Sequence, residues 1–71
     1  MCIASVKSMT YALKVKKTLS EFYIDSNVVK LDASIAKAGC SYGVEFDCVN
    51  LYAVESALQK RGIKYNQIIN Y

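Results

Sequence analysis

The apolar pattern of this 71-residue chain repeats the order strand, helix, strand twice. Short segments that are rich in β-branched residues, or that alternate apolar and polar residues, predict four strands, at 2–6, 28–31, 42–46 and 64–69. Between them, apolar residues recur at steps of three and four, which is typical of amphipathic helices, at 9–22 and 51–60. A chain of this length has room for one small core, so residues 1–71 are expected to form a single domain.

This order of elements limits the possible topologies. With right-handed crossovers in both halves, it predicts an α+β, ferredoxin-like βαββαβ sandwich. Four antiparallel strands then form one sheet, and both helices cover one of its faces. The other face is open unless a partner covers it, and such a face often serves for the formation of a homodimer.

Two residues are expected to mark helix ends. Ser8 offers a hydroxyl as N-cap of the first helix. Gly62 has the place of the left-handed residue that follows the second helix, and Ile63 is placed for the hydrophobic contact beyond it. The apolar stripe of the first helix is predicted to consist of Met9, Ala12, Val15 (or Leu13), Leu19 and Phe22.

Composition excludes several classes of protein. No apolar run approaches the roughly 18 residues that a membrane span needs, and the start of the chain does not resemble a signal peptide. A net charge of +3 is a mild excess, so a nucleic-acid binder is not expected. The chain has no histidine, and its acidic residues show no spacing typical of acid–base catalysis. We therefore expect neither a metal site nor a cofactor.

The three cysteines of the sequence match no disulfide framework or zinc motif. A reduced, cytoplasmic protein is the better interpretation. Cys2 and Cys48 are expected at the same edge of the sheet, as packing residues. Cys40 differs from them, because it lies between Gly39 and Gly43 in the long connection before the third strand.

The predicted topology gives Cys40 a chemical context. The connection before the third strand lies at the sheet edge where the first strand ends and the first helix begins. There the positive end of the helix dipole, with Lys7 or Lys37 nearby, would lower the thiol pKa and favour the thiolate. Thiolate is the nucleophile in persulfide and disulfide chemistry, and glycines leave room for a substrate. The candidate site has Cys40 as its reactive residue, supported by Lys7, Ser8, Lys37, Gly39, Ser41 and Gly43.

The segment Gly39-Cys40-Ser41-Tyr42-Gly43-Val44 resembles a family of short bacterial sulfur/selenium carrier-like proteins. The opening of the chain and its ending are also similar to that family, so the resemblance covers nearly the whole sequence. The family commonly has glycine directly after the cysteine, where this chain has Ser41, whose hydroxyl could hydrogen-bond to the sulfur. The resemblance implies that Cys40 is the carrier thiol and that the partners are sulfur-donor and sulfur-acceptor proteins.

Three functions stay open from the sequence. The first is a relay of sulfur or selenium by the Cys40 thiolate, which makes the protein a carrier rather than a conventional enzyme. The second is a non-catalytic binding or regulatory module that acts as a dimer, with Cys40 as a small packing residue. The third is RNA binding, which requires aromatic side chains on the outer face of the central strands. We expect the face that Tyr42, Val44 and Phe46 share to pack on the helices instead.

Overall fold

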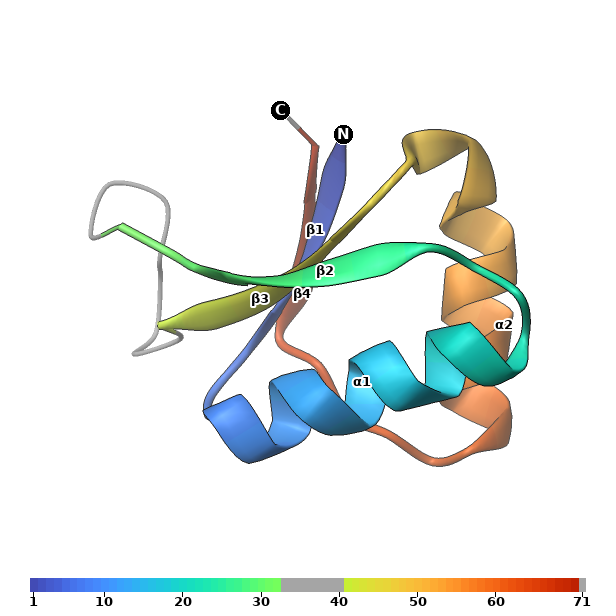
Figure 1. Cartoon of the computed structure of the whole chain (residues 1–71), viewed down its shortest axis with the longest axis horizontal. Coiled ribbons are helices and arrows are strands. Elements are labelled where there is room, and N and C mark those ends of the chain that lie inside the picture. The colour runs from blue at the N-terminus through green and yellow to red at the C-terminus, as the bar shows by residue number, and fades with distance from the viewer. Residues whose placement is uncertain (33–40, 71) are drawn as a thin grey trace.

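The computed structural model of the chain describes residues 1–32 and 41–70. Its elements are, in order, β1 (Cys2–Val6), α1 (Met9–Glu21), β2 (Ser26–Lys30), β3 (Tyr42–Phe46), the 3₁₀ turn η1 (Cys48–Asn50), α2 (Leu51–Lys60) and β4 (Gln67–Asn70). The four strands form one sheet in the order β2-β3-β1-β4, and each neighbouring pair is antiparallel. This arrangement confirms the predicted α+β, ferredoxin-like fold (Figure 1).

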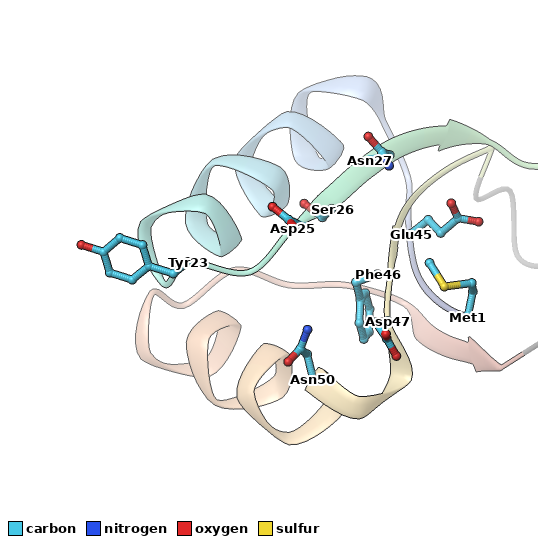
Figure 2. A pocket seen from close by; sticks show the side chains of 9 residues that line it. All are labelled: Met1, Tyr23, Asp25, Ser26, Asn27, Glu45, Phe46, Asp47 and Asn50. Carbon is cyan, nitrogen blue, oxygen red and sulfur yellow. The ribbon is translucent and has the colours of Figure 1, made fainter.

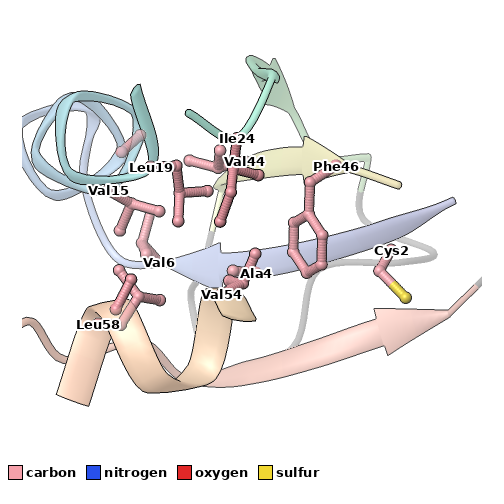
Figure 3. Packing of buried hydrophobic residues seen from close by; sticks show 12 residues of the cluster. Cys2, Ala4, Val6, Val15, Leu19, Ile24, Val44, Phe46, Val54 and Leu58 are labelled. Carbon is pink, nitrogen blue, oxygen red and sulfur yellow. The ribbon is translucent and has the colours of Figure 1, made fainter. Parts of the chain in front are cut away.

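The hydrophobic core lies between the sheet and the two helices. Alternate residues of β1 and β3 face the helices, because successive side chains of a strand point to opposite faces. Figure 3 shows these strand residues together with the apolar side chains of α1 and α2. They belong to one cluster of buried residues, whose central members are Ala4, Val6, Val15, Leu19, Val44, Phe46, Val54 and Leu58. Both helices therefore cover the same face of the sheet.

The aromatic and aliphatic face of β3 contributes to this core. Val44 and Phe46 are 0% and 1% exposed, and Tyr42 packs against the same cluster. The expectation that this face packs on the helices is confirmed. The platform of exposed aromatic residues that RNA-recognition sheets need is therefore not formed by this face of β3.

The apolar stripe of α1 differs from the prediction at its first position. Ala12, Val15 and Leu19 are fully buried, whereas Leu13 is 54% exposed, so Val15 takes the position that the sequence left open. Met9 is 44% exposed, and its assignment to the buried stripe was wrong. The physical reason is position: Met9 is the first residue of α1, beyond the end of β1, and does not belong to the core cluster.

The end of α2 confirms the prediction at Gly62. Its φ of 64° is left-handed, its N–H donates to the carbonyl of Gln59 (3.1 Å), and the Ile63 N–H donates to the carbonyl of Leu58 (3.0 Å). These two bonds define a Schellman motif, which satisfies carbonyls at the helix end. The same motif ends α1, but there the left-handed position holds Tyr23, with φ 61° and a side chain that is 97% exposed.

Two strands have other bounds than the sequence predicted. β2 begins earlier than the expected 28–31 range, because Ser26 already pairs with Phe46 of β3. β4 begins later than the expected residue 64, because its pairing with β1 starts at Gln67, opposite Ser5. In both cases the partner strand, rather than local composition, sets where the ladder begins.

The central strand β1 is buried on both faces. On the face away from the helices, Ile3 is 4% and Ser5 1% exposed. Gly43 of β3 is part of the reason, because a Cβ atom at this position would overlap the Cγ2 methyl of Ile3. The centre of the predicted open face is therefore filled by Ile3, which lies over the glycine.

Candidate functional site

Strand pairing brings three element ends together at one edge of the sheet. Tyr42, the first residue of β3, pairs with Val6 at the end of β1 and with Lys30 at the end of β2. Beyond the strands, the Leu31 N–H donates to the Ser41 carbonyl (2.8 Å) and extends the β2–β3 pairing by one bond. The sequence predicts that the second strand ends and the third begins beside the end of the first strand. The structure confirms this arrangement (Figure 1).

Helix α1 begins at this same edge. The Ser8 hydroxyl accepts a hydrogen bond from the Tyr11 N–H (3.3 Å), and the Ser8 carbonyl accepts one from the Ala12 N–H (3.1 Å). Ser8 is therefore the N-cap that the sequence predicts. The first turn of α1 contains no acidic residue, so no carboxylate within it compensates the positive end of the helix dipole. Lys7 is exposed directly before the cap and adds a full positive charge.

Ser41 directly precedes β3, the neighbour of β1 in the sheet, and Gly43 is the second residue of β3. Ser41 is exposed, and its carbonyl is held by the bond from Leu31. Gly43 was expected to leave room for a substrate, but the space of its missing side chain is taken by Ile3. This glycine is explained by packing within the sheet.

Lys37, Gly39 and Cys40 lie outside the described residues. Four of the seven predicted site residues, namely Lys7, Ser8, Ser41 and Gly43, are described. Cys40 directly precedes Ser41 in the sequence. The described part of the site is thus a sheet edge that joins a helix start, an exposed lysine and the residue bonded to Cys40.

The other two cysteines form a disulfide, Cys2–Cys48. The expectation that they are reduced packing residues was therefore wrong. Cys2 pairs with Phe46 in the β1–β3 ladder, and Cys48 begins η1 two residues later, so their Cα atoms are 5.1 Å apart. This separation lies within the usual range for a disulfide. Their neighbouring places at one sheet edge were the signal in the sequence, but their separation of 46 residues matches no short motif.

A hollow lies at the other end of the β1–β3 pair, where Phe46 is paired with Cys2 (Figure 2). It measures about 350 Å³. Three of its lining residues are carboxylates, and Figure 2 shows the side chain of Tyr23 directed away from the others. The lining residues are Met1, Tyr23, Asp25, Ser26, Asn27, Glu45, Phe46, Asp47 and Asn50. Within residues 1–32 and 41–70, no group of three or more carboxylate or cysteine side chains is arranged to hold a metal ion.

The sequence model of one protein family, described as "Putative Se/S carrier protein-like", matches residues 1–70. The chain belongs to this family. The match spans nearly the whole chain and includes every described element. No curated protein and no solved structure matches the chain.

The described helices of the chain are short. The longest in the described ranges is α1, with 13 residues. A helix that crosses a bilayer needs about 20 apolar residues. Across residues 1–32 and 41–70, no helix meets that requirement.

Proposed function

We propose that this chain carries sulfur or selenium and that the Cys40 thiolate is the group that bears the transferred atom. The family match supports a carrier. The observation that singles out Cys40 is the Cys2–Cys48 disulfide: the sequence has three cysteines, and this bond uses two of them. The cysteine that is left is the one in the segment that resembles the family.

The loading step is a thiol exchange with a persulfide. The Cys40 thiolate attacks the terminal sulfur of a donor persulfide, a new S–S bond forms, and the donor leaves as its thiolate when its own S–S bond breaks. The proton of the terminal sulfur stays with that sulfur. No oxidant or reductant is required, because a persulfide and a thiolate are consumed and a persulfide and a thiolate are formed. Release to an acceptor thiolate is the same reaction in reverse.

The described sheet edge supports this chemistry electrostatically. Lys7 and the start of α1 place positive charge at the edge to which the residue after Cys40 belongs. Such surroundings favour thiolate over thiol and thereby lower a cysteine pKa. Lys37 and Gly39, the neighbours of Cys40 in the sequence, are proposed to add a further charge and conformational freedom.

The rate of Cys40 alkylation as a function of pH tests this proposal. The intact protein, with its disulfide formed, is treated with iodoacetamide, and the modified residue is identified by mass spectrometry. We expect Cys40 to be alkylated with an apparent pKa below the value of about 8.5 of a free thiol. Lys7→Gln should raise that pKa. The matched variant Lys60→Gln should change it less, because Lys60 ends α2 next to Arg61, which pairs with Glu21 at the far end of α1. A Cys40 that is unreactive, or that titrates as a free thiol, would contradict the proposal.

Partners and location follow as parts of the proposal. A carrier needs donor and acceptor proteins, and a homodimer stays a prediction from the fold class. A cytoplasmic location also stays a prediction. In that compartment most disulfides are transient or redox-active, so Cys2–Cys48 would be expected to exist in reduced form as well.

A further inference from the structure

A small hollow lies where β1 ends, α1 begins and the chain approaches β4. Its volume is about 150 Å³. Three segments contribute to it: the end of β1, the first turn of α1, and the segment between α2 and β4. The lining residues are Val6, Lys7, Tyr11, Lys64, Tyr65 and Asn66.

The charges around this hollow are of one sign. Lys7 and Lys64 both line it, although they are far apart in the sequence, and none of its lining residues is acidic. Neither lysine forms an ion pair with a carboxylate in the part of the chain that the structure describes. A third ammonium group, that of Lys14, lies 5.4 Å from the centre of the Tyr11 ring. The fold therefore gathers positive charge here without compensating it.

None of the six acidic residues lines this hollow, and Asp32, which follows β2 at the same end of the sheet, is separated from β1 by β3. Asp25, Glu45 and Asp47 line the hollow at the opposite edge of the sheet, and Glu21 pairs with Arg61 (3.2 Å). The net charge of +3 thus hides a separation of charge between the two hollows, one with three carboxylates and one whose charged lining residues are lysines. Such a separation gives an anion a preferred place on the molecule.

The walls of the hollow are held by hydrogen bonds to β1. The Asn66 N–H donates to the Ser5 carbonyl (2.7 Å), and the Ser5 hydroxyl donates to the Gln67 carbonyl (3.2 Å). At the other end of this segment, the Schellman motif at Gly62 fixes the direction in which the chain leaves α2. The backbone on either side of Lys64 is therefore held in place, and binding does not require it to be ordered first.

Size limits the ligand. Pockets for drug-sized molecules measure roughly 300–1,000 Å³, and this hollow is smaller. Two ammonium groups, tyrosine side chains and an asparagine amide supply donors, which suit an anion with several oxygen atoms. The positive end of the α1 dipole acts in the same direction.

We propose that this hollow binds a small oxyanion, such as thiosulfate, sulfate or phosphate, between Lys7 and Lys64. The site consists of described residues alone and does not depend on whether Cys40 accepts sulfur. If the chain is a sulfur carrier, a sulfur oxyanion is the ligand of interest, because the hollow adjoins the sheet edge at which Ser41 follows Cys40.

The test is a titration followed by the amide NMR chemical shifts of the Cys40→Ser protein. Thiosulfate, sulfate and phosphate are added separately at constant ionic strength, with chloride as the reference. We expect saturable shifts at Lys7 to Tyr11 and at Lys64 to Asn66. Lys7→Gln and Lys64→Gln should each weaken binding about fivefold, as for the loss of one exposed charge pair. Lys30→Gln removes the same charge on β2 and should weaken it less than twofold.

The outcomes separate the sources of the anion and the two proposals. Tighter binding of thiosulfate than of phosphate identifies a sulfur oxyanion, and the reverse order identifies a phosphate ligand; both support the site. The proposed site is overturned if the chemical shifts do not saturate, or if the three lysine variants weaken binding equally. Binding of an acidic peptide at this place without binding of any of the three oxyanions also overturns it. Because Cys40 is absent from the protein used, these results do not depend on the carrier reaction.

Discussion

A disulfide joins Cys2, the first residue of β1, to Cys48, the first residue of η1. It links the start of the central strand to the segment that leads into α2. Cys2 is 1% exposed and belongs to the hydrophobic core cluster, against which Cys48 packs. The bond therefore ties one end of the core together, at the edge opposite the candidate site.

Removal of this disulfide should destabilise the protein strongly. The bond closes a loop with a sequence separation of 46 residues, and the chain-entropy relation gives a loss of about 4 kcal/mol for a loop of this size. The Cys2→Ser/Cys48→Ser variant and the oxidised parent can be compared by urea denaturation. Equal free energies of unfolding would show that the bond does not constrain the unfolded chain.

Replacement of Gly43 by alanine should destabilise the sheet. The added methyl group would overlap the Cγ2 atom of Ile3, and overpacking of this kind costs about 1–3 kcal/mol. Ser41→Ala, at an exposed position two residues earlier, serves as the control and should be nearly neutral. In an Ile3→Ala background the cost of Gly43→Ala should shrink, because the overlapping atom is gone. A cost that is the same in both backgrounds would refute this explanation of the glycine.

Tyr23→Gly should stabilise the protein by about 0.5–1 kcal/mol. Tyr23 has a left-handed backbone that disfavours residues with a Cβ atom, and its side chain is 97% exposed. Tyr52→Gly is the matched control, since Tyr52 is 84% exposed within α2, where glycine should instead cost about 0.5 kcal/mol. Thermal unfolding of the two variants should shift in opposite directions. A loss of stability in both would contradict the account of the α1 end.

Ser8→Ala should remove the N-cap of α1 at a cost of about 1 kcal/mol. The control is Ser20→Ala, an exposed position near the end of the same helix, where alanine should be neutral or slightly stabilising. Denaturation of both variants measures the difference. If Ser8→Ala behaves like Ser20→Ala, the hydrogen bond from Tyr11 to the hydroxyl contributes no stability.

The sequence predicts a helix end where the residue type itself signals the backbone conformation, and misses it where the residue type gives no signal. The end of α2 was predicted correctly because glycine is the common residue in a left-handed conformation, and Gly62 follows the apolar stripe. The equivalent end of α1 was not predicted at Tyr23, because a tyrosine gives no local sign of that conformation. The edge that joins Lys7, Ser8 and Ser41 follows from the order of elements alone, so this part of the site was accessible from the sequence.

The features that the sequence did not predict depend on contacts between elements that are far apart in the chain. The disulfide depends on the register that places Cys2 opposite Phe46, and a sequence separation does not specify a register. The filling of the Gly43 position by Ile3 also depends on the pairing of β1 with β3. The hollow between Lys7 and Lys64 requires the docking of the segment before β4 on β1. These features arise from tertiary structure, which the residue pattern of a single sequence predicts only weakly.

The most direct test of the carrier proposal is the loading of sulfur onto Cys40. The oxidised protein is incubated with a low-molecular-weight persulfide, and the site of modification is determined by mass spectrometry of the intact protein and its peptides. Ser20→Ala, at an exposed position near the end of α1, serves as the control variant with the site unchanged. The account predicts that the parent and Ser20→Ala each gain one sulfur atom on Cys40, that Cys40→Ser gains none, and that an added thiol removes the sulfur again. Equal loading of Cys40→Ser, or no loading of the parent, would contradict it.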